Sequence, residues 1–332
     1  MKFGPVPLAD AAGAVLAHSL VLDNVRFRKG LALEPDHIAA LASAGLETVV
    51  VARRGPDDED ENAAAARIGA RLVSDGLKLS PVATGRANLI AESAGVLRVD
   101  VRAINTLNAI DEAVTLATLS DFAPVRPDQL VATIKIMPYA VPGDIVEAGE
   151  ATLLEPPIKL HQYQGGSVRL VMTRTPGFKE SLIEKGEAAV RSRVEALGYR
   201  LDDVQTVAHA EDDIADALKD TNADLTLILG ASATSDRNDV APGGVVAAGG
   251  VVDRFGMPVD PGNLLFLGSM PNGKPVVGLP GCARSPALNG VDWVLERLAA
   301  GFPVTGAEIA AMGVGGLLKE MPGRPQPRRM KD

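Results

Sequence analysis

A stretch of small and hydroxyl-bearing residues offers the clearest chemistry in this sequence. Residues 230–239, GASATSDRND, directly follow the apolar segment 224–229. Small side chains let the backbone approach a ligand closely, and backbone N–H groups with nearby hydroxyls can bind phosphate oxygens. The segment therefore predicts an anion-binding loop, with an ordinary turn as the alternative. Its candidate ligand-binding residues are Gly230, Ala231, Ser232, Thr234 and Ser235.

Two carboxylates in the same loop predict a metal ion. Asp236 and Asp239 supply the oxygen ligands that Mg²⁺ prefers, so both are candidate metal-binding and catalytic residues. Arg237, which lies between them, could pair with an anion. With Mg²⁺ and a phosphate in place, such a protein would act mainly by positioning charged groups.

A second loop follows another strand-like segment. Residues 280–286 read PGCARSP. Ser285 is expected to cap a helix over residues 286–298, because a proline occupies the first helical position. Arg284 and several backbone N–H groups would then lie at a helix N-terminus, which attracts anions.

A third polar turn, residues 257–263, lies between these two loops in the chain. It reads MPVDPGN, in which proline and glycine again favour a close backbone approach. The candidate ligand-binding residues of the second and third loops are Pro261, Gly262, Pro280, Gly281, Arg284 and Ser285.

Strand-like and helix-like segments alternate across residues 167–302. The nearly continuous apolar run at 224–229 is typical of a parallel strand covered on both faces. This alternation predicts an α/β fold with a doubly wound, mostly parallel sheet, in which ligands bind beyond the carboxyl ends of the strands. Ser181 and Glu184 form a capping-box pattern. Strands are expected over 168–173, 204–208, 224–229 and 276–279, and helices over 181–197, 212–218 and 286–298.

Smaller α/β regions are expected before that domain. Residues 1–52 predict a strand–helix–strand unit, and residues 53–160 an inserted α/β region. Prolines and glycines near residues 155–166 mark the boundary before the main domain at 167–302, and residues 303–332 form a C-terminal tail. Within the inserted region, helices are expected over 62–74 and 110–118, and strands over 97–103 and 132–139.

Composition and charge exclude several classes of function. The 332 residues are 46% hydrophobic and 23% charged, as in globular proteins, and the net charge of −9 opposes nucleic-acid binding through phosphate contacts. No apolar run is long enough for a membrane span, and the first residues lack the apolar core of a signal peptide. The single cysteine, Cys282, cannot form an internal disulfide, so the chain fits the cytoplasm. Cys282 is either a packing residue or a thiol beside the anion site.

The three loops, in this order, resemble the molybdopterin-binding domain shared by molybdopterin adenylyltransferases and molybdopterin molybdotransferases. LILGASATSDRNDVAPGG is similar to the first ligand-binding element of that family, with Asp239 at its aspartate position. VDPGN is similar to a Lys-Pro-Gly segment, and LPGCARSP to a Leu-Pro-Gly-Asn-Pro segment. The resemblance covers about residues 168–300. It departs at Ala231, Asp260 and Cys282, which stand where the family has glycine, lysine and asparagine.

Two N-terminal segments, DAAGAVLAHSL and RKGLALEPDHIAALASAGLETVVVA, resemble the molybdotransferases. Together the resemblances imply a molybdopterin-binding protein of molybdenum cofactor biosynthesis that inserts molybdate into adenylated molybdopterin. They also imply Mg²⁺, a homo-oligomer and a molybdopterin nucleotidyltransferase as partner. Two alternatives stay open. One is a non-enzymatic molybdopterin carrier or regulator that serves a nucleotidyltransferase or a maturing molybdoenzyme, and the other is a nucleotide pyrophosphatase-like relative.

Overall fold

The computed structural model describes residues 1–22, 25–219, 221–260 and 262–318, in two compact units, Met1–His161 and Gln162–Asp332. Both units combine helices with β-sheets, so the chain has the α/β fold class that the sequence predicts. In the described part of the chain, no helix combines the length and the apolar character needed to cross a membrane.

The first unit begins with a small sheet in the strand order β1-β5-β2, formed by β1 (Lys2–Pro7), β5 (Thr48–Arg53) and β2 (Val15–Leu16). Helix α1 (Pro35–Ser43) packs on it through Leu41, which is fully buried with Leu16 and Val51. The helix has proline at its first position, and Gly45 follows its end with a φ of +84°. The turn η1 (Leu8–Asp10) and a hairpin of β3 (Leu20–Leu22) and β4 (Val25–Phe27) complete this part.

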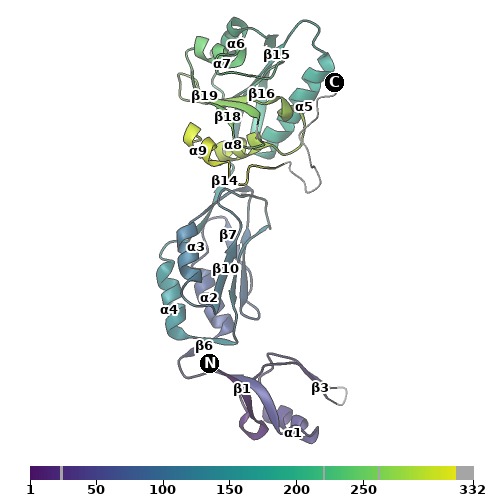
Figure 1. The fold of residues 1–332 in the computed structure, drawn as a ribbon, viewed down its shortest axis with the longest axis vertical. Helices are drawn as coiled ribbons and strands as arrows, with labels where there is room; N and C mark the ends of the chain where they lie inside the picture. Colours follow the sequence, from purple (N-terminus) through teal and green to yellow (C-terminus); the bar gives the residue numbers. More distant parts are fainter. Residues whose placement is uncertain (23–24, 220, 261, 319–332) are drawn as a thin grey trace. The chain divides into compact units, whose positions relative to one another are not determined.

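The rest of the first unit is a β-sheet with a layer of helices packed on it. Its main sheet has the order β10-β12-β8-β7, and helices α2, α3 and α4 lie on one face of it (Figure 1). Two smaller sheets, β11-β9-β14 and β13-β6, flank it. The helices are α2 (Glu61–Ala70), α3 (Val101–Asn108) and α4 (Gly143–Thr152). The strands are β6 (Asp58–Asp60), β7 (Leu77–Leu79), β8 (Arg86–Ala91), β9 (Gly95–Val99), β10 (Val114–Thr118), β11 (Pro124–Val125), β12 (Leu130–Ile136), β13 (Ala140–Pro142) and β14 (Ile158–Gln162).

Several expectations for residues 53–160 are wrong in detail. The expected strand over 97–103 ends at Val99, because Asp100 caps helix α3 by accepting a hydrogen bond from Ala103 N at 3.0 Å. Of the residues expected as a helix over 110–118, residues 114–118 form strand β10, in which Val114 and Leu116 are buried while their neighbours are more exposed. The helix expected over 62–74 stops at Ala70, and the strand expected over 132–139 spans Leu130–Ile136.

The second unit is built on one six-stranded sheet with the order β16-β15-β17-β20-β19-β18. Strands β16, β15, β17 and β20 are parallel, and β19 and β18 are antiparallel to their neighbours. Their bounds are β15 (Gly166–Arg174), β16 (Tyr199–Ala208), β17 (Leu225–Leu229), β18 (Val251–Met257), β19 (Asn263–Ser269) and β20 (Pro275–Leu279). The mostly parallel sheet agrees with the sequence expectation.

Helices cover both faces of this sheet, which explains the apolar runs in the strands. Alternate residues of β15 point to opposite sides: Leu170 and Met172 join the core under α5 and α8, and Val171 joins the core under α6 and α7. All five residues of β17 are buried. The helices are α5 (Glu180–Ala196), α6 (Glu211–Leu218), α7 (Val240–Ala247), α8 (Gly290–Ala299) and α9 (Gly306–Ala311), with a short turn η2 (Gly281–Arg284).

Two helix starts differ from expectation. Helix α5 begins at Glu180 without a side-chain cap, so Ser181 and Glu184 form no capping box there. The helix expected from residue 286 with Ser285 as its cap begins at Gly290 instead. Asn289 caps it, and the expected tail beyond residue 318 lies outside the described residues.

Candidate functional site

Strand register brings the three loops to one edge of the second unit's sheet. Leu229 pairs with Leu279 in the parallel strands β17 and β20, so residues 230–239 and 280–289 leave the sheet at the same end. Strand β19 runs antiparallel to β20, and Met257 pairs with Asn263, so the connection between β18 and β19 lies at this end too. We call this end, beyond the carboxyl ends of the parallel strands, the carboxyl edge. Such edges are where open α/β sheets bind ligands.

Asp239 holds the first loop in shape. Its Oδ1 accepts from Val240 N at 2.8 Å, which caps helix α7, and its Oδ2 accepts from Ser235 N at 2.8 Å and from the Ser235 hydroxyl at 3.3 Å. These hydrogen bonds, with the Ser235 amide first, lower the pKa of Asp239. Asp239 is therefore a carboxylate at neutral pH, fixed at the start of the helix.

Asp236 and Arg237 occupy different surroundings in the same loop. Asp236 is exposed, and its Oδ1 accepts from Asn238 N at 2.8 Å and Asn238 Nδ2 at 3.0 Å. Arg237 donates to the carbonyl oxygens of Val252 at 2.7 Å and Asp253 at 2.9 Å. Its guanidinium thus braces the loop against strand β18, although the sequence suggested an anion as its partner.

Arg284 connects the loop after β20 with the loop after β17. Its guanidinium donates to the carbonyl oxygens of Gly230 at 2.7 Å and Leu182 at 3.2 Å. It also lies over the ring of Phe178, 5.5 Å from the ring centre, and its burial lowers the pKa of Arg284. Pro280 beside it is buried, whereas Gly281, Cys282 and Ser285 are exposed.

The third loop is only partly described. Pro261 lies outside the described residues, and Gly262 has a φ of +95°, which favours glycine. Asp260 accepts a hydrogen bond from Leu318 N at 3.0 Å, and its own N–H donates to Gly316 O at 2.6 Å. The aspartate at the family's lysine position therefore anchors the segment that follows α9.

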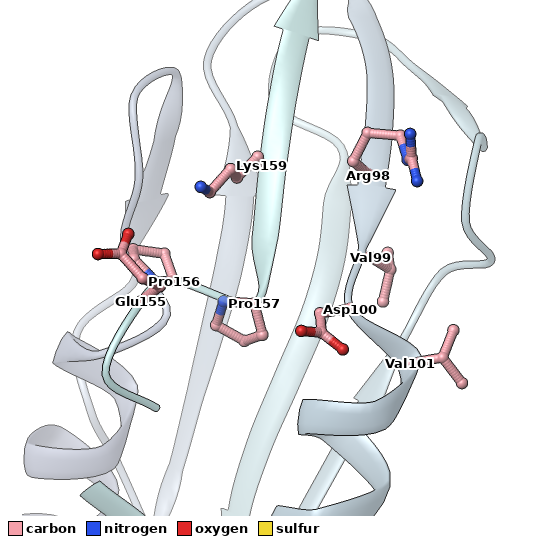
Figure 2. Close-up of a pocket in the computed structure, with 8 residues that line it drawn as sticks. All are labelled: Arg98, Val99, Asp100, Val101, Glu155, Pro156, Pro157 and Lys159. Carbon is pink, nitrogen blue, oxygen red and sulfur yellow. The ribbon is translucent and has the colours of Figure 1, made fainter. Parts of the chain in front are cut away.

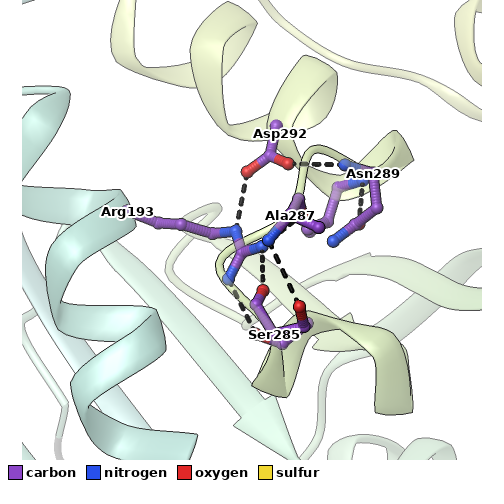
Figure 3. Close-up of polar contacts among 7 residues, drawn as sticks. Arg193, Ser285, Ala287, Asn289 and Asp292 are labelled. Atoms are coloured by element: carbon purple, nitrogen blue, oxygen red, sulfur yellow. Dashed lines mark hydrogen bonds and ion pairs between the residues drawn. The ribbon is translucent and has the colours of Figure 1, made fainter. Parts of the chain in front are cut away.

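Arg193 is a positioning residue that sequence reasoning missed. It projects from α5 with its side chain 9% exposed, and its Nε donates to Asp292 Oδ1 at 2.7 Å. Its other nitrogens donate to the carbonyl oxygens of Ala283, Ser285 and Ala287 (Figure 3). With three carbonyls turned toward one guanidinium, residues 286–289 do not join the helix that was expected from residue 286, which begins at Gly290. No motif marks this arginine, because its partners are backbone atoms about ninety positions away.

Thr173 and His209 form a second contact that the sequence did not indicate. Thr173, at the end of β15, is fully buried, and its Oγ1 accepts from Ala231 N at 2.7 Å. The same oxygen lies 2.8 Å from Nδ1 of His209, in the turn between β16 and α6. The pair therefore ties two neighbouring turns of the carboxyl edge to the first residues of the candidate loop.

The two predicted metal ligands suit Mg²⁺ only together with a bound phosphate. Within the described ranges, no three His, Cys, Asp or Glu side chains are placed to hold a metal ion. Mg²⁺ commonly uses one or two carboxylates and completes its shell with water and substrate phosphates. Exposed Asp236 fits such a role, while both oxygens of Asp239 already accept hydrogen bonds.

The first unit carries a separate cavity of about 510 Å³ (Figure 2). Two of its charged side chains have structural partners: Asp100 caps α3, and Arg98 donates to Asp121 Oδ1 at 3.0 Å while stacking on Phe122. It is lined by Arg98, Val99, Asp100, Val101, Glu155, Pro156, Pro157 and Lys159. The prolines that marked the expected domain boundary thus form one of its walls.

Comparison with known proteins gives limited information. Residues 5–53 match a family described as a domain of unknown function, DUF8806. No curated protein matches the chain. A solved structure of a molybdopterin biosynthesis moea protein from Pyrococcus horikosii is 14% identical with a TM-score of 0.31, covering 90% of this chain and 76% of that one. A molybdenum cofactor biosynthesis protein from Pyrococcus furiosus is 14% identical with a TM-score of 0.23, covering 93% of this chain and 65% of that one. TM-scores of 0.31 and 0.23 at 14% identity carry no conclusion about function.

Proposed function

We propose that this chain binds a phosphorylated pterin of the molybdopterin type and works in molybdenum cofactor biosynthesis as a molybdotransferase-like enzyme. One observation carries the proposal. The three segments that resemble the molybdopterin-binding domain are separated in the chain, yet strand register brings them to the same carboxyl edge. Loops that follow parallel strands share this edge in any such sheet, so the shared edge allows one common site, and the family's order of the three segments is what favours molybdopterin as its ligand.

In this proposal the loop after β17 binds the pterin phosphate. Backbone N–H groups and the exposed hydroxyl of Ser232 supply hydrogen bonds, while Ser235 holds Asp239 at the start of helix α7 directly behind them. Mg²⁺ held by Asp236 would neutralise phosphate charge when bound. The chain's own residues position the adenylated substrate so that molybdate can displace AMP.

A carrier or regulator is the second candidate. Two residues expected to face the ligand are engaged within the protein: Asp239 as the cap of α7, and Arg284 with the carbonyls of Gly230 and Leu182. A protein that only holds the cofactor for a nucleotidyltransferase or a maturing molybdoenzyme would need neither group free. Self-association and a nucleotidyltransferase partner belong to both versions of the proposal.

The test is an anaerobic titration with molybdopterin and with adenylated molybdopterin, with and without Mg²⁺ and molybdate, followed by product analysis. Saturable binding with AMP release that requires molybdate is the expected result. AMP release without molybdate would identify a pyrophosphatase-like relative, and binding without turnover a carrier. No binding of either pterin would contradict the proposal.

Asp239→Asn sharpens this test. Asparagine keeps the Oδ1 that caps helix α7, but its amide nitrogen cannot accept from Ser235 as Oδ2 does, so the variant loses these loop hydrogen bonds together with the carboxylate charge. A Mg²⁺-dependent enzyme should then lose most turnover, and pterin binding measured on the same variant shows whether the loop still binds. Asp236→Asn is the companion variant, because Asp236 is the more exposed carboxylate.

A further inference from the structure

We propose that His209 is a ligand-contacting residue of the carboxyl edge, which donates a hydrogen bond from Nε2 to a phosphate oxygen of the bound molecule. Thr173 holds the imidazole in the required tautomer. The inference rests on the proposed function only in placing a phosphate-bearing ligand at this edge. It adds a contact that neither the loop motifs nor the resemblance contains.

His209 lies at the carboxyl edge of the sheet, next to the candidate loop. Strands β15 and β16 are parallel, and Arg174 pairs with Ala208, so His209 leaves the sheet at the carboxyl edge. Its backbone N–H donates to Arg174 O at 3.0 Å, which fixes the turn. A Cβ built on Gly230 would lie 3.8 Å from Cε1 of His209, so the imidazole borders the first residue of the candidate loop. His209 is half-buried and can meet a ligand from solvent.

The hydrogen bonds of Thr173 determine the tautomer. Thr173 Oγ1 accepts from Ala231 N at 2.7 Å, and it lies 2.8 Å from His209 Nδ1. A hydroxyl has one proton, and in the described part of the chain His209 Nδ1 is the acceptor available to it. A neutral imidazole with Nδ1 accepting carries its proton on Nε2. This network therefore assigns Nε2 as a donor.

The donor at Nε2 is available to a ligand. None of the described hydrogen bonds uses Nε2 of His209, whereas its Nδ1 is engaged. The imidazole borders Gly230, so a ligand held at the start of this loop lies next to His209. Phosphate oxygens are acceptors that match such a set, and bonds to charged acceptors are the stronger ones.

The experiment uses the full chain labelled with ¹⁵N-histidine. The four histidines give few signals, and His209→Phe identifies the signals of His209. Without ligand, the neutral ring should show an unprotonated Nδ1 and a protonated Nε2. Adding inorganic phosphate, and then molybdopterin, should shift the Nε2 signal of His209. Signals of His18, His37 and His161 should stay in place and serve as internal controls.

Binding measurements separate contact from structure. His209→Phe keeps the shape without a donor and should weaken phosphate and molybdopterin binding about tenfold, the value of one charge-assisted hydrogen bond. His209→Gln should recover part of this loss through its amide N–H. Thr173→Val should abolish the tautomer preference, and Thr173→Ser should restore it.

The outcomes distinguish this inference from the proposed function. Molybdopterin binding that is equal in wild type and His209→Phe, with an unmoved Nε2 signal, would overturn the inference and leave the function intact. His209-dependent phosphate binding without molybdopterin binding would support the inference and contradict the function. Absence of both kinds of binding would overturn both.

Discussion

At the scale of single residues, two arginines on α5 show how differently the same side chain can act. Arg193 is almost fully buried and bonds to Asp292 and to three backbone carbonyls of the loop after β20. Arg191 is 38% exposed and pairs with Glu187 and Glu195 on its own helix. Because Arg193 is buried and its partners would be left unpaired, its contacts are costly to lose. Water screens the ion pairs of Arg191, so they contribute little.

Arg193→Ala should lower the free energy of unfolding by about 3 kcal/mol, because Asp292 and the carbonyls lose a buried partner. Arg191→Ala is the matched control and should cost less than about 1 kcal/mol. Urea unfolding monitored by circular dichroism measures both. Equal costs for the two variants would contradict the structural role assigned to Arg193.

Glu296 on α8 should make stability depend on pH. Burial, with the nearby charge of Asp292, raises the pKa of Glu296 to about 7, from an ordinary value of 4.5. A group with a raised pKa in the folded state contributes stability below its unfolded pKa, and this contribution is lost as the pH rises through about 7. Glu296→Gln should therefore be more stable than wild type at pH 8, by about 2 kcal/mol, and equal to it near pH 4. Unfolding curves at both pH values measure the difference. A stability gain of Glu296→Gln over wild type that is the same at pH 4 and pH 8 would contradict the prediction.

At the scale of elements, the start of α8 depends on a capping box that forms in the folded loop. Asn289 Oδ1 accepts from Val291 N at 2.9 Å, and Asp292 Oδ2 accepts from Asn289 N at 2.8 Å. Ser285, the expected cap, is exposed and lies before the helix. The cap therefore sets where the last loop of the candidate site ends.

Asn289→Ala should lower the free energy of unfolding by about 1–2 kcal/mol, because a buried cap loses its acceptor. Ser285→Ala should change it by less than about 0.5 kcal/mol. Thermal unfolding of the two variants provides the comparison. A larger cost at Ser285 would place the helix start where the sequence suggested.

Strand β20 needs glycine where it faces its neighbour. A Cβ on Gly278 would collide with the buried ring of Phe266, its register partner on β19, whereas a Cβ on Gly281 would meet no atom within 4 Å. The ring thus fills the space that the glycine leaves open at the centre of the sheet.

Gly278→Ala should destabilise the protein by about 3 kcal/mol or more through overpacking. Gly281→Ala should be nearly neutral in stability, although it lies two residues from the strand end. Urea midpoints measure both effects. The second variant also tests the site, since a methyl group there would obstruct a ligand that approaches the Pro280–Gly281 backbone.

At the scale of the whole molecule, the chain divides into Met1–His161 and Gln162–Asp332, and each unit has cores of its own. A unit that buries its own apolar side chains can fold independently. The candidate loops all belong to the second unit, so their geometry depends on that unit's sheet.

The two units should therefore be separable. Residues 1–161 and 162–332, expressed apart, should each unfold cooperatively, and the second should keep the phosphate binding proposed for the full chain. Calorimetry and phosphate titration test this. If residues 162–332 are unfolded when expressed without the first unit, the site needs both units.

Elements with strong patterns could be predicted from the sequence, whereas the conformations and contacts of the loops could not. The run at 224–229 became the buried strand β17, and Pro35 and Gly45 marked the ends of α1. Residues 110–118 read as a helix because their apolar spacing is ambiguous over so short a segment, and pairing with β12 made residues 114–118 a strand. The helix expected from residue 286 begins at Gly290 instead, and the carbonyls of Ser285 and Ala287, which a helix from residue 286 would use, accept from Arg193.

The sequence by itself determined the α/β class, the alternation of strands and helices in the second unit, and the three loops with their small and polar residues. These features follow from local periodicity and turn chemistry. The tertiary structure set which side chains of these loops are engaged within the protein. It turned Arg237 and Arg284 toward backbone carbonyls, made Asp239 a helix cap, and brought Thr173 and His209 beside Ala231. The physical reason is that such hydrogen bonds join residues far apart in the chain, and their partners are backbone groups that every residue shares.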